Sequence, residues 1–287
     1  MRTFIIGDVH GMLPELEELV TRLNPRSGDR FAFLGDLVDK GPDSIGVIDF
    51  VRALVDRFPD SVVICGNHEE SAIRLFDKAQ KAGTWDGIRK AEKETWLKAV
   101  DSERVEWLRS LPLFARLDPG ILLVHGGLLP AYFDKYDALP SASPESWHRG
   151  GGKTVDRMRR MLRIRHVYKP GSVSAKGKDI TGQMVQLGDE GENTQHWTDW
   201  YDGREGFVFF GHDPQKAGRP CLSRHALALD TGAVFGGRLT AAIVDQEEDL
   251  EEGRTNFHVS TGDGLIRVRF ESVGSRKMAD WLEAYEA

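Results

Sequence analysis

The sequence FIIGDVHG at residues 4–11 is a short apolar run that ends in glycine, a carboxylate and an imidazole. The same arrangement recurs in FAFLGDLVDKG at residues 31–41 and in VVICGNHE at residues 62–69. Between these segments, apolar residues recur at helical spacing over residues 13–23 and 45–55. Strand-like runs that alternate with amphipathic helices are typical of α/β proteins, so the first half of the chain predicts helices packed on a sheet.

Two later apolar runs end in the same way, ILLVHGG at residues 121–127 and FVFFGHDP at residues 207–214. The second half contains closely spaced strand-like runs at residues 207–210, 226–229, 239–244, 256–258 and 265–270. Their close spacing predicts antiparallel pairs. Residues 168–195 are rich in Gly, Ser and Lys, and a hairpin, a lid and a disordered loop are all compatible with this composition.

The composition is that of an ordinary globular protein. The chain has 287 residues, of which 40% are hydrophobic and 29% charged, and these values exclude collagen, coiled-coil and disordered classes. A chain of this length can bury about three quarters of its unfolded surface around one core. We therefore expect a single domain over residues 1–287, with residues 168–195 as its variable excursion.

Cysteine usage and hydropathy predict a cytoplasmic protein without membrane attachment. Cys65 and Cys221 cannot form a disulfide framework, which fits a reducing compartment. The N-terminal apolar run is interrupted at Asp8, well short of a signal-peptide core. No apolar run approaches the ~18 residues that a membrane span requires. The sequence leaves the oligomeric state open.

The charge balance restricts the class of substrate. Lys and Arg number 38 and Asp and Glu number 45, so the formal net charge is -7. Such a field repels polyanions, and we expect no stable binding of nucleic acid. A small anionic substrate would need a local cationic site.

The side chains that follow the five apolar runs form a candidate metal site, because ligands of α/β folds bind beyond the carboxyl ends of strands. These side chains are Asp8, His10, Asp36, Asn67, His125 and His212. Oxygen and imidazole donors without thiolates suit Mn, Fe, Zn, Co or Ni. Two carboxylates, one amide and three imidazoles suffice for two ions if one carboxylate bridges them. This number of ligands predicts a two-metal hydrolase with ions about 3.5 to 4 Å apart.

The predicted charge of this site favours phosphoester chemistry. Two divalent ions, two carboxylates and a bridging hydroxide leave about one positive charge, which attracts phosphate, and metal-bound hydroxide can then attack phosphorus. His68 follows Asn67 but lies outside the ligand set, so it is a candidate general acid for the leaving oxygen. Asp39 either holds the other ring nitrogen of His68 or caps the turn before Gly41.

These motifs together resemble a known family. GDVHG at residues 7–11, GDLVDKG at 35–41, GNHE at 66–69, HGG at 125–127 and GH at 211–212 are similar to the successive motifs of one group of phosphoesterases. This group is the phosphoprotein-phosphatase branch of the calcineurin-like metallophosphoesterases. LDTGAVFGGRLTA at residues 229–241 resembles the C-terminal signature of bacterial members, including symmetrical diadenosine tetraphosphate hydrolases.

The resemblance implies a two-sheet β-sandwich flanked by helices, an enzymatic activity and two divalent ions, with Mn preferred over Fe, Zn, Co and Ni. It assigns the first ion to Asp8, His10 and Asp36, with Asp36 as the bridge, and the second to Asn67, His125 and His212. His68 and Asp39 take the positions of the acid pair.

The candidate substrate-binding residues are less closely matched to the family. Lys40 stands where protein phosphatases of this branch usually have Arg, and Lys offers a point charge instead of a planar fork. Arg204 resembles the second phosphate-binding Arg of the family, with a surface charge as the alternative. Arg163 and Arg165 resemble a basic segment of the dinucleoside polyphosphate hydrolases, with a solvated helix end as the alternative.

We expect symmetrical cleavage of dinucleoside polyphosphates of the diadenosine tetraphosphate type. The Lys40 position and the C-terminal signature favour this reading over a protein Ser/Thr or Tyr phosphatase that uses the same site. Hydrolysis of RNA 5' ends or cyclic nucleotides is a further alternative. A non-catalytic binding module would be expected to have lost ligands or the acid, whereas the complete set is present.

Overall fold

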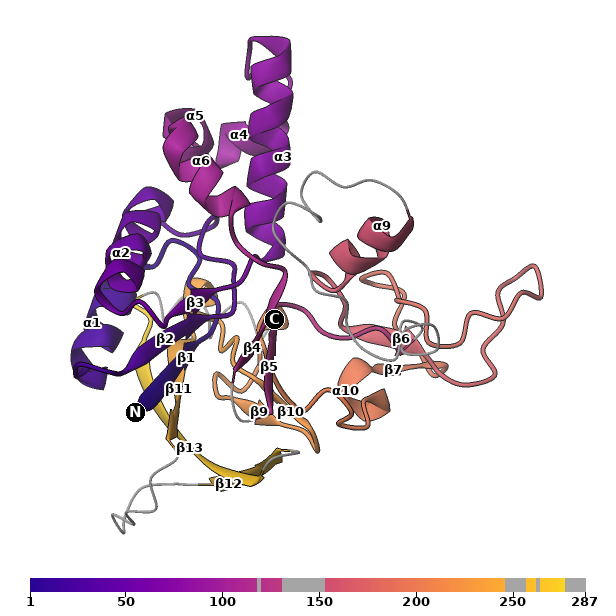
Figure 1. Ribbon diagram of the computed structural model, residues 1–287. Helices are drawn as coiled ribbons and strands as arrows, with labels where there is room; N and C mark the ends of the chain where they lie inside the picture. Colours follow the sequence, from indigo (N-terminus) through magenta and orange to yellow (C-terminus); the bar gives the residue numbers. More distant parts are fainter. Residues whose placement is uncertain (118–119, 131–152, 246–256, 262–263, 277–287) are drawn as a thin grey trace.

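The computed structural model describes residues 1–117, 120–130, 153–245, 257–261 and 264–276, and the chain folds around two β-sheets (Figure 1). The first sheet has six strands in the order β12 (Phe257–Thr261), β13 (Gly264–Gly274), β11 (Arg238–Asp245), β1 (Arg2–Ile6), β2 (Arg30–Phe33) and β3 (Val62–Val63). The second has five strands in the order β4 (Phe114–Leu117), β5 (Ile121–Val124), β8 (Phe207–Phe210), β10 (Ala226–Ala228) and β9 (Cys221–Leu222).

The two sheets pack face to face through alternate residues of their strands. Ile5 of β1, Leu123 of β5 and Phe209 of β8 are fully buried in one cluster that joins both sheets. Their neighbours Phe4 and Phe210 face the opposite way, into a second cluster that includes the helices. Successive side chains of a strand point to opposite faces, so both faces of each sheet are covered. This arrangement confirms the expected β-sandwich flanked by helices.

Helices pack against the outer faces of the sheets or against one another. They are α1 (Leu13–Leu23), α2 (Ser44–Arg57), α3 (Asn67–Ala82), α4 (Arg89–Lys93), α5 (Trp96–Ala99), α6 (Ser102–Arg109), α9 (Lys153–Arg160) and α10 (Trp197–Trp200). Leu16 and Leu19 of α1 pack in the cluster of Phe4, as the sequence periodicity predicts. No helix in the described part of the chain is both long and apolar enough to cross a membrane.

Each sheet contains three neighbouring parallel strands. In the first sheet, β1 pairs parallel with β2, and β2 pairs parallel with β3. In the second sheet, β5 pairs parallel with β8, and β8 pairs parallel with β10. The carboxyl ends of each set therefore meet at one edge of its sheet, where side chains from distant parts of the sequence come together.

The prediction of antiparallel pairs in the second half is correct for three strands and wrong for two. Strands β11, β12 and β13 form antiparallel pairs. Strands β8 and β10 are parallel because the chain returns between them through β9, which pairs antiparallel with β10. Close spacing in sequence therefore did not give the direction of this pair.

The excursion at residues 168–195 is a long hairpin. Its base is the antiparallel pair of β6 (His166–Tyr168) and β7 (Thr194–His196), and it extends away from the sheets in Figure 1. Isolated bridges join Val167 to Met184 and Val173 to Asp179 along it. Of the three alternatives for this segment, the structure thus has the hairpin.

Replacing Phe209 by Ala tests the contact between the sheets. Phe209 is fully buried between them, so truncation should lower the free energy of unfolding by about 3–5 kcal/mol. Urea denaturation followed by circular dichroism measures this change. The control is Leu187→Ala, because Leu187 is 78% exposed and should matter by less than about 0.5 kcal/mol. Equal effects of the two substitutions would contradict the packing described.

Candidate metal centre

The predicted ligands lie in turns at the carboxyl ends of the parallel strands. Asp8 and His10 follow β1, Asp36 follows β2, and Asn67 begins α3, the next element after β3. In the second sheet, His125 follows β5. His212 follows β8 in the same way. The structure therefore brings the six residues singled out in the sequence to one place.

The turns that carry these side chains have an unusual backbone. Within the described ranges, six non-glycine residues have positive φ angles, and five of them are His10 (49°), Asp36 (50°), Asp39 (70°), Lys40 (67°) and His212 (66°). Left-handed backbone costs free energy for residues with a Cβ and persists where the surroundings enforce it. Its concentration in these turns indicates a functional site.

Two glycines allow carboxylates to approach the backbone closely. A Cβ at Gly66 would lie 2.2 Å from Oδ1 of Asp36, and a Cβ at Gly211 would lie 2.1 Å from Oδ1 of Asp8. The glycines in GNHE and GHD are therefore required by the positions of the two acids.

The rings of two histidines are oriented by main-chain carbonyls. Nδ1 of His10 donates to the carbonyl oxygen of Val38 at 2.9 Å, and Nδ1 of His125 donates to that of Leu34 at 2.7 Å. A carbonyl oxygen can only accept, so Nδ1 carries a proton in both rings and Nε2 is directed into the site. Imidazoles that bind metals usually donate their other ring N–H to a carbonyl or carboxylate in this way, which fixes the orientation of the ring.

Asp36 lies at the middle of the cluster. Its Oδ2 is 3.5 Å from Nε2 of His10, and its Oδ1 is 3.3 Å from Nε2 of His125. Asn67 Oδ1 lies 3.0 Å from the same His125 nitrogen. The backbone N–H of His212 reaches both carboxylate oxygens of Asp8 at 3.1 and 3.2 Å. A carboxylate between two sets of donors has the geometry expected of a bridge.

The ligand atoms form two groups that share Asp36. One group is His10, Asp36 and His68, and the other is Asp36, His125 and His212, with all ligand atoms of each group within 4.8 Å of one another. His68 lies within the first group, and Asp8 lies beside it, with its Oδ2 3.9 Å from Nε2 of His10.

Burial and neighbouring charges shift the pKa values of the buried acids and imidazoles of this site. Burial, reinforced by Asp230 and Asp36, holds the pKa of Asp8 well above its usual range. Burial lowers the pKa of His10 to about 3. It also lowers that of His212, together with the nearby His125. At Asp36 the cost of burial is outweighed by His125 and His68, which hold its pKa well below the usual range. The lowered pKa values keep His10 and His212 neutral, and neutral imidazoles beside buried carboxylates form a donor set that fits divalent cations.

His68 and Asp39 form a hydrogen-bonded pair at the edge of this cluster. Nδ1 of His68 lies 2.6 Å from Oδ2 of Asp39, which leaves Nε2 toward the site, 3.9 Å from Asp36. Asp39 is fully buried and also accepts from Nε1 of Trp96 at 2.8 Å and from the Lys90 ammonium. Burial is outweighed at Asp39 by the bonds from His68 and Lys90, so its pKa is lowered and it stays ionised. Asp39 therefore orients the His68 ring.

Two buried acids of the site were missed in the sequence. Glu69 accepts backbone N–H groups of Gly66, Asp36 and Leu37 at 2.7 to 2.8 Å, and it thereby fixes the turn that carries Asp36. Asp230 follows β10, and burial raises its pKa to about 6. The sequence pattern that identifies the candidate ligands is also found here, because the apolar run at residues 226–229 is followed by the carboxylate of Asp230.

Three of the four predicted substrate-binding cations lie beside the cluster. Nζ of Lys40 is 2.9 Å from Nε2 of His10. Arg163 donates to the carbonyl oxygen of Asn67 at 3.3 Å, and Arg165 donates to that of His212 at 2.8 Å.

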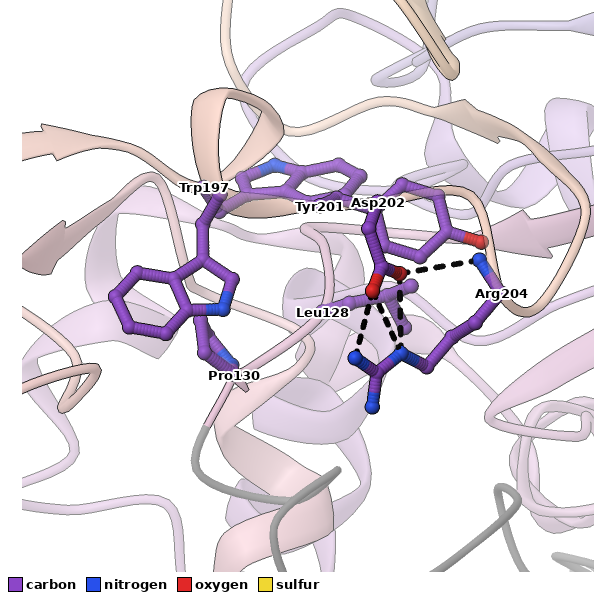
Figure 2. A pocket seen from close by; sticks show the side chains of 7 residues that line it. Leu128, Pro130, Trp197, Tyr201, Asp202 and Arg204 are labelled. Carbon is purple, nitrogen blue, oxygen red and sulfur yellow. Dashed lines mark hydrogen bonds and ion pairs between the residues drawn. The ribbon is translucent and has the colours of Figure 1, made fainter.

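Arg204 bonds to a neighbour in its own loop. It forms an ion pair with Asp202 at 2.6 Å, and both line a small pocket with Leu128, Pro130 and Tyr201 (Figure 2). None of the six candidate ligands lines this pocket. The Arg204 side chain is 51% exposed, which fits the alternative of a surface charge.

Comparison with known proteins assigns the chain to a family. The model of the calcineurin-like phosphoesterases matches residues 1–216, which is most of the chain. The chain belongs to the calcineurin-like phosphoesterase family. It is therefore a phosphoesterase hydrolase, as its motifs predict.

Two curated relatives match this phosphoesterase over most of its length. A symmetrical bis(5'-nucleosyl)-tetraphosphatase of Chromohalobacter salexigens is 29% identical over 284 residues, which cover 88% of this chain and 98% of the relative. An asymmetrical bis(5'-nucleosyl)-tetraphosphatase of Anoxybacillus flavithermus is 28% identical over 273 residues, which cover 89% and 96%.

Solved structures confirm the fold. A crystal structure of a candidate diadenosine tetraphosphatase has a TM-score of 0.58 at 24% identity and covers 96% of this chain and 93% of its own. A mutant cold-active protein tyrosine phosphatase has a TM-score of 0.54 at 15% identity and covers 85% and 76%. At these identities the likeness concerns the fold alone.

Replacing Glu69 by Gln tests how Asp36 is held. The amide of Gln points N–H groups at backbone donors, so one or more buried donors lose their acceptor, at a cost of about 2–3 kcal/mol in unfolding free energy. Metal content after loading and gel filtration should also fall. The control is Glu103→Gln, because Glu103 is exposed on α6. Normal metal content with normal stability would show that Glu69 does not hold the turn.

Proposed function

We propose that this phosphoesterase hydrolyses dinucleoside polyphosphates of the diadenosine tetraphosphate type. The observation that supports this most is the match to bis(5'-nucleosyl)-tetraphosphatases over nearly their whole length. The matched relatives include both symmetrical and asymmetrical enzymes. The C-terminal signature at residues 229–241 favours symmetrical cleavage for this chain. The structural similarity to protein phosphatases concerns the fold and does not favour a phosphoprotein substrate.

The candidate cluster would hold two divalent ions, with Asp36 shared between them. His10 and Asp8 would complete one set, and Asn67, His125 and His212 the other. When bound, such ions polarise phosphate oxygens and supply a nucleophile from water at neutral pH. We propose manganese as the bound metal, because imidazole and carboxylate donors bind it. Fe, Zn, Co and Ni are the alternatives, because the same donors bind them as well.

The residues around the cluster would bind and protonate the substrate. His68 presents Nε2 to the site while Asp39 holds Nδ1, so His68 is placed to give a proton to the leaving oxygen. Lys40, Arg163 and Arg165 lie beside the ligands and would attract the phosphate chain. Arg204 is not included, because it pairs with Asp202 in a separate pocket.

We further propose that residues 1–287 act as one domain in the cytoplasm. The two sheets share one buried interface, which supports a single folding unit.

The substrate is tested by product analysis. The Mn-loaded protein is incubated with diadenosine tetraphosphate, and products are separated by ion-exchange chromatography. Symmetrical cleavage gives ADP alone, whereas asymmetrical cleavage gives AMP and ATP. A panel of phosphopeptides is assayed in parallel, with kcat/KM as the common scale. Higher kcat/KM for the peptides would reject the proposal in favour of a protein phosphatase.

The role of His68 is tested by His68→Asn. Loss of the general acid should lower kcat by about 10²–10⁴ while metal content stays normal. The loss should shrink for substrates whose leaving group needs no proton, such as a dinitrophenyl phosphate. His258→Asn is the matched control, because His258 is exposed on β12. If kcat is unchanged with both leaving groups, His68 is not the acid.

A further inference from the structure

A basic cleft lies along α3, the helix that begins with the proposed ligand Asn67. It encloses about 610 Å³, within the range of about 300–1,000 Å³ for small-ligand sites. Its walls come from α3, α6 and α9, which lie together in the upper part of Figure 1. The charged residues that line it are Glu70, Arg74, Asp77, Lys78, Lys81, Arg109 and Arg159. Five of these side chains are cationic and two are acidic, in a chain whose net charge is -7.

The two acids in the cleft are neutralised by neighbours. Glu70 accepts from Arg163 at 2.7 Å, and Asp77 forms an ion pair with Arg109 at 2.8 Å. Arg74, Lys78 and Lys81 are exposed, and within the described ranges no carboxylate lies within ion-pair distance of them. The cleft therefore presents uncompensated positive charge to solvent.

Helical spacing connects this charge to the metal centre. Asn67, Glu70, Arg74, Lys78 and Lys81 follow at intervals of three or four residues, so they lie on one face of α3. At 1.5 Å per residue, the row extends about 20 Å from the proposed ligand Asn67. Arg163 bridges the beginning of the row, because it donates both to Asn67 and to Glu70.

We propose that this cleft binds the distal part of a nucleoside polyphosphate whose reacting phosphate lies at the metal centre. This inference rests on the proposed function and assigns Arg74, Lys78 and Lys81 to substrate selection. A row of separate ammonium and guanidinium groups fits a chain of phosphates, whereas a simple phosphomonoester ends at the metals, beside the first turn of α3, and does not reach Arg74, Lys78 or Lys81. The cleft thus favours long polyphosphate substrates over small esters.

The test combines a double charge reversal with two substrates. Arg74→Glu with Lys78→Glu leaves the helix intact, because both positions are exposed and Glu is a good helix former. With the metal-loaded variant, kcat/KM for diadenosine tetraphosphate should fall roughly tenfold or more through KM, and added salt should reduce the difference. Hydrolysis of p-nitrophenyl phosphate should stay within about twofold of wild type. Lys98→Glu, at an exposed position of α5 outside the cleft, is the matched control.

A binding measurement separates this inference from the proposed function. Inorganic tripolyphosphate is titrated calorimetrically into the full chain in the presence of a chelator, where no turnover is needed. Wild type and Lys98→Glu should bind it, and the double variant should not. Absent binding by wild type, or equal binding by the double variant, overturns the cleft assignment. Failure of wild type to cleave diadenosine tetraphosphate while tripolyphosphate binding follows this pattern rejects the proposed substrate and keeps the cleft.

Discussion

The carboxylate of Glu69 joins the two turns on which the candidate centre depends. Buried in the first turn of α3, it accepts N–H groups from Gly66 and, across the sheet edge, from Asp36 and Leu37. These bonds compensate the left-handed backbone of Asp36, which has little intrinsic stability. If Asp36 left this conformation, the Nε2 atoms of the surrounding imidazoles would lose their common carboxylate. The other candidate ligands can share ions only while the Asp36 carboxylate stays in its present position.

Electrostatics explains why such a site occurs in an acidic protein. Asp8, Asp36 and Asp230 are buried close together, and burial with mutual repulsion raises the pKa of Asp8 and Asp230. This negative cluster attracts cations, and divalent ions would reverse the sign of the local field. Lys40 and Arg163 add positive charge at the rim. An anionic substrate can then be drawn to one place on a surface that otherwise repels it.

Local patterns in the sequence were enough to predict the strands that carry the site. Each apolar run that is followed by an Asp, Asn or His is a strand of one of the two parallel sets, and the carboxyl ends of these strands meet at one edge of their sheet. Asp230 obeys the same rule but sits in an Asp-Thr-Gly sequence typical of a turn, so its burial was not evident. The parallel pairing of β8 with β10 depends on a return through β9, and the position of Arg204 depends on an ion pair in its own loop. Strand direction and loop ion pairs depend on tertiary contacts, and these contacts produce no periodic pattern in the sequence.

Helix α3 relates the chemistry of the site to its selectivity. The helix begins at Asn67 and His68, whose positions are fixed by the Glu69 bonds, and it continues to Ala82. A helix of 16 residues is a rigid rod of about 24 Å, so its exposed cations keep a constant distance from the cluster. A loop bearing the same charges would lose conformational entropy on binding, whereas α3 is already ordered. Charge on this face can therefore distinguish long phosphate chains from short ones without any change in the ligands themselves.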